Sequence, residues 1–162
     1  KEVCGIELGI KWVNDLYKDD RKVCGILTEA VTDFESGSIE FAIVGIGLNL
    51  YVNQETLSEE LRGVAGGIYP DQQAARSADR NRLVAQIVNH LLSETKDLKL
   101  SQEYAAHNIV PGHDITIIDN KNRRSARALS ICEDGRLLVE EADGTRNKLS
   151  FGEISIKLPS TN

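Results

Sequence analysis

Two long apolar runs joined by a short polar turn constrain this chain most strongly. Residues 23–31 and 39–47 both read as strands, and residues 35–38 between them have the Glu-Ser-Gly-Ser composition of a turn. The pattern predicts an antiparallel hairpin. Because both runs are nearly continuous in apolar residues, we expect both faces of the hairpin to be at least partly covered.

Composition narrows the class of protein. The chain has 162 residues, 41% of them hydrophobic and 27% charged, which is typical of a globular protein. Its net charge of -6 argues against nucleic-acid binding as the main role, because such surfaces are usually basic. Three cysteines without a C-x-x-C spacing favour a reducing cytoplasm over a disulfide framework or a zinc site. A first residue of lysine and the absence of methionine lead us to expect a piece of a longer protein.

The middle of the chain is predicted to be helical or irregular. Apolar residues recur at helical spacing between residues 83 and 92, which predicts an amphipathic helix with Ser77 as its N-cap and an end near Asp97. A shorter helix is expected over residues 101–107, and another over residues 58–62 within a polar loop.

Short strands dominate the C-terminal third. Turn-forming residues separate five apolar segments, which are residues 115–118, 126–132, 137–141, 146–149 and 154–158. This spacing predicts a small closed barrel that is marginal by itself and packs on the preceding part. We therefore expect an α+β chain with two domains, residues 1–107 and 108–162.

Charged and amide side chains gather around one predicted turn. Lys11 and Lys22 flank Asn14 and Asp15 there. An ammonium about 4 Å from a phosphate oxygen contributes ~4 kcal/mol at an effective dielectric constant near 20. The cluster is therefore a candidate nucleotide-phosphate site with Mg²⁺ at Asp15. The competing interpretation is that these lysines are ordinary solvated charges at a strand edge.

Glycines interrupt the two apolar runs at Gly25, Gly45 and Gly47. One interpretation is close approach of a ligand to the backbone, and the other is a β-bulge or barrel corner. Asn49, which follows the second run, is either a ligand contact or a plain turn residue. The only tryptophan, Trp12, is expected in the core rather than stacked on a ligand.

At these residues the chain resembles the biotin protein ligases, which attach biotin to a carboxylase lysine. Members of that family carry K-W-P-N-D, then R-K-[AVLC]-[ACG]-G-I-L-x-E, then G-x-G-[IVL]-N. This chain has K-W-V-N-D at residues 11–15, R-K-V-C-G-I-L-T-E at 21–29 and G-I-G-L-N at 45–49. Val13 replaces the usual proline and removes no functional group. The family also ends in a small SH3-like barrel, which matches residues 108–158.

The resemblance implies a two-step reaction. Biotin's carboxylate attacks the α-phosphate of ATP to give biotinyl-5′-AMP and pyrophosphate, and the amine of the acceptor lysine then displaces AMP. The resemblance makes Lys22 the catalytic residue, in contact with the biotin carboxylate and the bridging phosphate. It implies further biotin contacts from Gly25, Ile26, Gly45 and Gly47, and contacts to ATP and its Mg²⁺ from Lys11, Asn14, Asp15 and Asn49.

Fold and partners follow from the same resemblance. We expect a partial mixed sheet packed with helices, followed by the SH3-like barrel. The expected partner is the biotin carboxyl carrier domain of a carboxylase, with a homodimer as a further assembly and DNA only where the parent has an upstream helix-turn-helix. The family's Gly/Arg-rich adenylate-binding loop is absent from these residues, so the chain itself is expected to be a weak catalyst.

Two alternatives stay open at this point. The first is a lipoate or octanoate ligase or transferase of the same superfamily. The second is a non-catalytic module that dimerises or docks a carrier domain.

Overall fold

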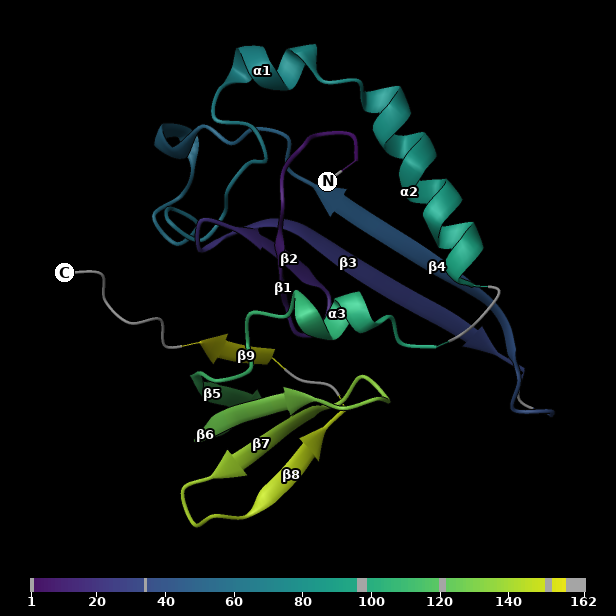
Figure 1. Cartoon of the computed structure of the whole chain (residues 1–162), viewed down its shortest axis with the longest axis vertical. Coiled ribbons are helices and arrows are strands. Elements are labelled where there is room, and N and C mark those ends of the chain that lie inside the picture. The colour runs from purple at the N-terminus through teal and green to yellow at the C-terminus, as the bar shows by residue number, and fades with distance from the viewer. Residues whose placement is uncertain (1, 34, 96–98, 120–121, 151–152, 157–162) are drawn as a thin grey trace. The chain divides into compact units, whose positions relative to one another are not determined.

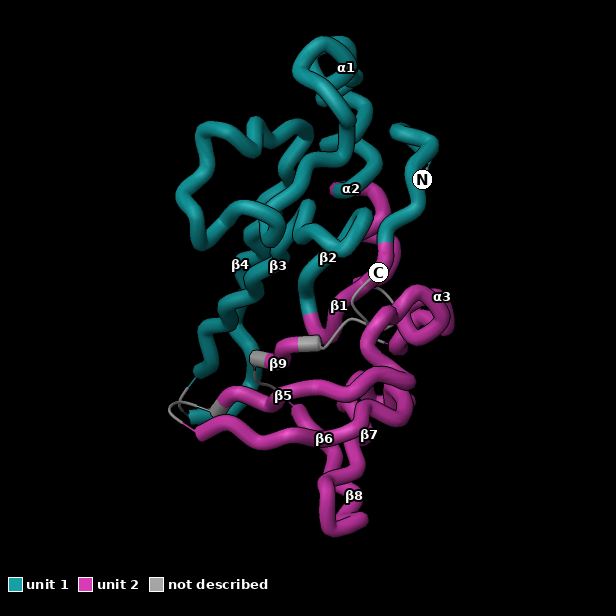
Figure 2. Tube along the Cα trace, turned by 90° about the vertical axis from the view of Figure 1, so that its left-hand side faces the viewer, with its two compact units in different colours: residues 1–8, 14–87 teal, residues 9–13, 88–162 magenta. Residues whose placement is uncertain are grey.

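The computed structural model describes residues 2–33, 35–95, 99–119, 122–150 and 153–156. Its helices and strands are shown in Figure 1. Two compact units divide the chain (Figure 2): unit 1 is residues 1–8 and 14–87, and unit 2 is residues 9–13 and 88–162. Within the described ranges, no helix is both long and apolar enough to cross a membrane. The expected domain division after residue 107 stays a prediction.

Unit 1 is built on the predicted antiparallel hairpin. β3 (Arg21–Thr32) pairs with β4 (Ile39–Leu48) in a register that places Gly25 opposite Gly47. The hairpin is thereby confirmed, with slightly longer strands than predicted. β2 (Asp15–Lys18) pairs with the beginning of β3, although the sequence indicated only turns in that segment.

Both hairpin turns follow from their residue types. Asp19 and Asp20 join β2 to β3 with φ angles of 48° and 60°, a left-handed conformation that Asp tolerates better than most residues. In the β3–β4 turn, Oδ1 of Asp33 accepts hydrogen bonds from the backbone N–H groups of Glu35 and Ser36, at 2.9 and 2.7 Å. Short polar side chains therefore close both turns.

The expectation that both hairpin faces are covered is wrong along most of β4. Leu27 and Ile43 on one face are 60% and 59% exposed, and Val44 and Ile46 on the other face are 36% and 39% exposed. The apolar pattern correctly indicated strands, but covering them requires packing partners. An apolar cavity lined by Cys24 and Leu48 lies at the end of the hairpin remote from its turn.

The main helix begins later than predicted. α2 (Arg80–Glu94) follows Asp79, whose Oδ1 accepts a hydrogen bond from the Arg82 N–H at 2.9 Å. Ser77 is not the N-cap, because it ends a separate helix, α1 (Gln72–Ser77). Asp is as effective an N-cap as Ser, so residue type alone did not distinguish the two positions. The predicted end near residue 97 lies outside the described residues.

The polar loop after β4 also differs from its prediction. Over residues 58–62 there is a turn rather than a helix, in which the Arg62 N–H reaches the Ser58 carbonyl. The helical turn in this loop is the 3-10 helix η1 (Gln54–Thr56), which Asn53 caps by accepting a hydrogen bond from the Glu55 N–H.

Unit 2 contains a five-stranded antiparallel sheet with the order β8-β7-β6-β5-β9. Its strands are β5 (Asp114–Asp119), β6 (Asn122–Ile131), β7 (Leu137–Glu141), β8 (Arg146–Leu149) and β9 (Glu153–Ile156). All five predicted strands are confirmed, β7 and β8 with the predicted bounds and the other three with shifted bounds. The predicted end at residue 158 lies outside the described residues. Over the described part of the sheet no pairing joins β8 to β9, while the strand number and order fit a small SH3-like barrel.

Alternation of side chains builds the core of unit 2. Ile115 of β5 and Val139 of β7 are fully buried and belong to one apolar cluster. β1 (Gly9–Lys11) leads into Trp12, which joins this cluster at 3% exposure and donates its indole N–H to the Gly135 carbonyl at 2.9 Å. The core role predicted for Trp12 is confirmed.

A short helix borders this core, as predicted. α3 (Gln102–Ala106) is capped by Ser101, whose hydroxyl accepts a hydrogen bond from the Glu103 N–H at 3.2 Å. Tyr104 packs against the apolar cluster and donates its hydroxyl to the Val13 carbonyl at 2.8 Å. Burial raises the pKa of the Tyr104 hydroxyl above its ordinary value.

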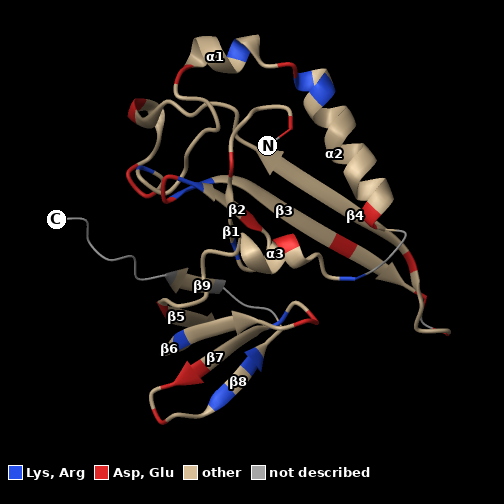
Figure 3. Ribbon diagram, in the orientation of Figure 1, with Lys and Arg blue, Asp and Glu red and all other residues tan. Residues whose placement is uncertain are grey.

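Acidic and basic residues alternate across β6, β7 and β8 (Figure 3). Arg127 of β6 lies opposite Glu140 of β7, which lies opposite Arg146 of β8. The Arg146 Nε is 2.8 Å from a Glu140 carboxylate oxygen. Each such exposed cross-strand pair typically stabilises a sheet by about 0.2–1 kcal/mol.

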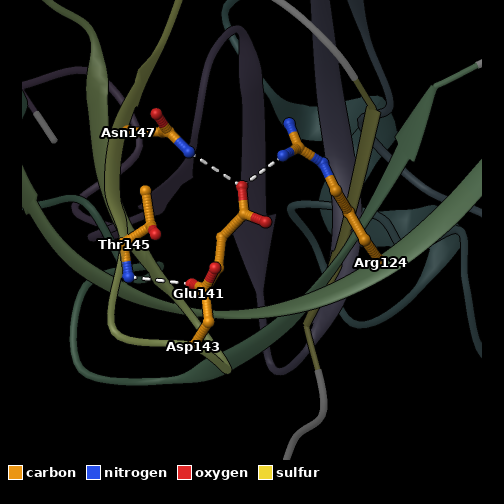
Figure 4. A network of polar contacts seen from close by, with 5 residues as sticks. All are labelled: Arg124, Glu141, Asp143, Thr145 and Asn147. Atoms are coloured by element: carbon orange, nitrogen blue, oxygen red, sulfur yellow. Dashed lines mark hydrogen bonds and ion pairs between the residues drawn. The ribbon is translucent and has the colours of Figure 1, made fainter.

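A second polar network lies beside this row (Figure 4). The Glu141 carboxylate accepts hydrogen bonds from Arg124 and, at 2.9 Å, from the Asn147 amide. The Asp143 carboxylate accepts one from the Thr145 N–H at 2.9 Å. Arg124 lies within β6.

Candidate functional site

A cleft on one face of the unit 1 sheet brings together most of the residues that the sequence singled out. Its volume is about 530 Å³. It is lined by Asn14, Asp15, Lys22, Gly25, Ile26, Leu27, Gly45, Ile46 and Gly47. Seven of the nine predicted site residues are in this set, and the other two are Lys11 and Asn49.

An ion pair occupies the polar end of the cleft. The Lys22 ammonium lies 2.6 Å from a carboxylate oxygen of Asp15, and the two side chains are 41% and 22% exposed. Both charges are therefore partly desolvated, yet both remain within reach of a ligand. The pair offers a cation for an anionic ligand group and a carboxylate for a metal or a hydrogen-bond donor.

Lys22 reaches the cleft because the β2–β3 ladder skips one residue. Cys24 and Lys22 pair with consecutive residues of β2, which leaves Val23 between them without a partner on that strand. In a regular strand, Lys22 and Gly25 face opposite sides of the sheet. The extra residue reverses the alternation, so Val23 and Cys24 are both buried and Lys22 lies on the same side as Gly25.

The glycines of β4 leave the cleft floor open. A Cβ built on Gly45 would approach only the Leu27 carbonyl oxygen, and one on Gly47 only the Gly25 carbonyl oxygen, both at 3.8 Å. Those separations are ordinary van der Waals contacts, so the fold has room for a side chain at both positions. The space above the backbone at Gly45 and Gly47 is open, and no packing clash within the fold requires glycine there.

The β-bulge interpretation of these glycines is wrong. Pairing is regular through Gly25 opposite Gly47 and through Leu27 opposite Gly45, and the register of this ladder shifts only beyond Val31. None of the three glycines has a positive φ angle. The backbone therefore does not require glycine at these positions, and the space above residues 45 and 47 is open.

Asn14, the residue before β2, is hydrogen-bonded to β3. Its side-chain amide donates a hydrogen bond to the Ile26 carbonyl, and its own carbonyl accepts one from the Ile26 N–H at 3.0 Å. These two bonds fix the backbone that carries Asp15 into the cleft. Asn14 thus has a structural role as well as a place in the cleft lining.

The two remaining predicted residues lie elsewhere. Asn49 follows β4 and joins neighbouring backbone, with its N–H bonded to the Val23 carbonyl at 2.8 Å and its carbonyl to the Ile68 N–H at 2.9 Å. Lys11 ends β1, which belongs to unit 2. Neither residue lines the cleft in unit 1.

Two ionisable side chains near the ion pair, Cys24 and Tyr17, have raised pKa values. Burial raises the pKa of the Cys24 thiol, the Asp15 carboxylate raises it further, and Lys22 opposes them. The same three influences, in the same order, raise the pKa of the Tyr17 hydroxyl. Ionisation of both groups is therefore disfavoured beside the ion pair.

Sequence reasoning missed two cleft residues, Leu27 and Ile46. Leu27 is two residues from Gly25, and alternation along a strand places such residues on one face. That spacing was a usable signal for Leu27. Ile46 lies between the two glycines of β4, so its side chain points to the opposite face and its backbone contributes to the cleft.

A smaller, apolar cavity of about 230 Å³ occurs within unit 1. Apolar side chains and two thiols line it, among them Cys4, Cys24, Leu83 and Ile87. Leu83 and Ile87 come from the predicted apolar stripe of α2 and line this cavity. The rest of the predicted stripe is exposed at Val84, Val88, Leu91 and Leu92, so the stripe is confirmed only in part.

Comparison with known proteins was made on sequence and on fold. No protein-family model matches the chain. It is 28% identical over 158 residues to the bifunctional ligase/repressor BirA of Bacillus subtilis (strain 168), which covers 90% of this chain and 46% of that protein. It is 30% identical over 155 residues to BirA of Escherichia coli (strain K12), covering 91% of this chain and 46% of that protein. The chain therefore spans about half the length of the curated relatives that it matches.

Solved structures share the fold. The biotin protein ligase from Aquifex aeolicus in complex with biotin and ATP superposes with a TM-score of 0.71 at 21% identity, over 96% of this chain and 64% of that one. The apo structure of the same protein gives 0.72 at 23% identity, over 96% and 67%. Sequence and fold together identify the chain as a relative of the biotin protein ligases that corresponds to their C-terminal part.

Proposed function

We propose that this chain forms one wall of a site that makes biotinyl-5′-AMP from biotin and ATP and passes biotin to a carrier-protein lysine. The observation that carries the proposal is the cleft, in which the Lys22–Asp15 pair lies beside the open glycines of β4. The relationship to proteins named as ligases supports it. The chain covers about half of those relatives, so the whole activity belongs to the proposal.

Lys22 is assigned the central electrostatic role. In the first step a carboxylate oxygen of biotin bonds to the α-phosphorus of ATP while the bond to pyrophosphate breaks, so two anions must approach each other. An ammonium between them lowers that repulsion and stabilises charge on the phosphoryl oxygens. The covalent work left to the protein is small, and positioning dominates.

Gly45 and Gly47 are assigned to the ring system of biotin. A flat bicyclic group can lie directly on backbone where no side chains project, and the two glycines provide that surface. On the neighbouring strand, Gly25 and Ile26 also line the cleft. The exposed Leu27 adds an apolar edge to the same face.

ATP is assigned to the polar end, with Asn14 and Asp15. Mg²⁺ commonly binds one or two carboxylates together with substrate phosphates. Asp15 is the only carboxylate among the residues that line the cleft, so it suits a cation shared with the phosphates rather than one held by protein alone. No group of three or more metal-binding side chains is present in the part of the chain that the structure describes. Lys11 and Asn49 remain proposed ATP contacts.

Replacing Lys22 tests the proposal directly. In a ligase that contains residues 1–162, Lys22→Ala is expected to lower biotin-dependent pyrophosphate release from ATP by about 10²-fold or more, the usual loss for one transition-state electrostatic contact. Lys148→Ala, a change on β8 of unit 2, serves as the matched lysine control. Near-normal adenylation by Lys22→Ala would refute the assignment, and adenylation of lipoate in place of biotin would favour the lipoate or octanoate alternative.

Partners and location belong to the same proposal. A biotin carboxyl carrier domain is the proposed acceptor, the cytoplasm the proposed compartment, and residues 1–107 and 108–162 the proposed domains. DNA is a partner only of a parent that has an upstream helix-turn-helix.

An interaction module is the second candidate function, because β4 exposes Ile39, Phe41 and Ile43. Exposed apolar strands favour association with another chain. Sedimentation of the chain at several concentrations tests this candidate, and a monomer throughout would argue against it.

A further inference from the structure

The three glycines of the cleft are not equivalent. A Cβ at Gly45 or Gly47 would meet only a carbonyl oxygen at 3.8 Å. A Cβ at Gly25 would lie 3.1 Å from both Cε and Nζ of Lys22 and 3.5 Å from a carboxylate oxygen of Asp15. The space above Gly25 is therefore already filled, by the end of the Lys22 side chain.

The path of the Lys22 side chain explains this difference. The skipped residue in the β2–β3 ladder turns Lys22 toward the cleft, and Asp15 lies directly opposite Gly25 across that ladder. To reach Asp15 at 2.6 Å, the ammonium passes over the Gly25 backbone. Any side chain at residue 25 would stand in that path.

We propose that Gly25 is a positioning residue, which keeps the surface of β3 clear so that Lys22 lies along the strand with its ammonium beside Asp15. The proposal deepens the proposed function and rests on it for the identity of the ligand, whose carboxylate and phosphate the ammonium meets. Gly25 then acts on the ligand through Lys22, whereas Gly45 and Gly47 act by direct contact.

Substitution at Gly25 is expected to displace the ammonium without unfolding the chain. The crowded atoms are at the end of a flexible side chain, so a few tenths of an ångström of movement relieves a methyl group. Valine suits a strand and has two methyl groups, so it forces a larger displacement. Gly25→Ala and Gly25→Val thus form a graded series at one position.

The first experiment measures Lys22 without any ligand. The chain is treated with a limiting amount of acetylating reagent, and modification of each lysine is followed by mass spectrometry. Asp15→Asn defines the rate for an unpaired Lys22, expected to be about two- to fivefold above wild type, as for loss of a partly exposed ion pair. Gly25→Val is expected to approach that rate, Gly25→Ala to fall between, and Gly45→Ala to match wild type.

Circular dichroism of each variant checks that the fold is retained. If Gly25→Val unfolds, Gly25→Ala carries the test, because it requires only a small shift. An unchanged rate of Lys22 acetylation in folded Gly25→Val would overturn the proposal. Where only Gly25→Ala folds, an unchanged rate in that variant would overturn it.

The second experiment is a double-mutant cycle in a ligase that contains these residues. Gly25→Ala is expected to slow formation of biotinyl-5′-AMP when Lys22 is present and to add nothing in a Lys22→Ala background. Equal effects in both backgrounds would make Gly25 an independent ligand contact and overturn the proposal. If Lys22 acetylation changes as expected but neither the wild-type ligase nor its Gly25→Ala variant adenylates biotin, the proposed function fails and the positioning role of Gly25 stands.

Discussion

Gly47 lies directly opposite Gly25 across the β3–β4 ladder, and a Cβ on Gly47 would meet only the Gly25 carbonyl oxygen, at 3.8 Å. The missing side chain at Gly47 leaves a gap in the sheet surface on β4, whereas the end of the Lys22 side chain fills the space above Gly25. The gap lies beside the ion-paired Lys22. This juxtaposition of an open surface and a cation is what makes the cleft a candidate ligand site.

Gly47→Val is expected to abolish biotin binding in a ligase that contains these residues, because two methyl groups would occupy the cleft floor. The melting temperature should stay within ~5 °C of wild type, since valine is favoured in strands and glycine weakens them. Calorimetric titration and thermal denaturation measure the two effects. Thr28→Val, on the other face of β3, is the control that should bind normally. Tight binding by Gly47→Val would place the biotin elsewhere.

Tyr104→Phe tests the contact between α3 and the Val13 carbonyl. Loss of this hydrogen bond should lower the free energy of unfolding by about 1 kcal/mol at pH 7. Burial raises the Tyr104 pKa above its ordinary value of 10.0, so its contribution is fully present below pH 10 and is lost as the pH rises through the folded-state pKa.

Urea titrations of wild type and Tyr104→Phe between pH 7 and 11 measure this effect. Wild type should lose more stability than the variant above pH 10. Parallel curves would show that ionisation of Tyr104 is not linked to folding.

Glu141→Gln tests the polar network of unit 2. The change removes the charge opposite Arg124 and keeps an oxygen that can accept from Asn147. The expected loss is about 0.5 kcal/mol at low salt, because the Arg124 side chain is 46% exposed and the pair is screened by solvent. In 1 M salt the difference between wild type and variant should shrink toward zero. A loss that is the same at both salt concentrations would assign the effect to packing.

Ile115→Ala should lower the free energy of unfolding of unit 2 far more than Tyr104→Phe or Glu141→Gln. Ile115 is fully buried in the apolar cluster, and such truncations cost about 2–5 kcal/mol through lost burial and the cavity left behind. Val44→Ala, on an exposed part of β4, is the control and should cost less than about 1 kcal/mol. Chemical denaturation of both variants provides the comparison, and similar losses for the two would contradict the assigned core.

Local residue chemistry made much of the fold predictable. The β3–β4 hairpin, the five strands of unit 2 and the short helix α3 each depend on residues close together in sequence. Alternation and turn composition report such elements directly. The core role of Trp12 was predictable for the same reason, since a lone large aromatic residue usually packs inside.

Features that depend on the pairing between elements were not predictable. Strict alternation assigns Lys22 to the face opposite Gly25, and only the skipped Val23 reverses this. The sequence suggested a ligand role for all three glycines alike, whereas the Lys22 side chain occupies the space at Gly25. Both outcomes depend on the β2–β3 register, and β2 was too short and too polar at its ends to be recognised.

The uneven covering of the β3–β4 hairpin has a consequence for its dynamics. Val23 is fully buried at one end of the ladder, while Val31 and Phe41 near the turn are 43% and 48% exposed. Local opening requires least free energy where few apolar contacts are lost. Amide hydrogen exchange should therefore be fastest near the turn and slowest around Cys24. The glycine floor lies near the slow end, so the candidate site is carried by the part of the hairpin that opens least often.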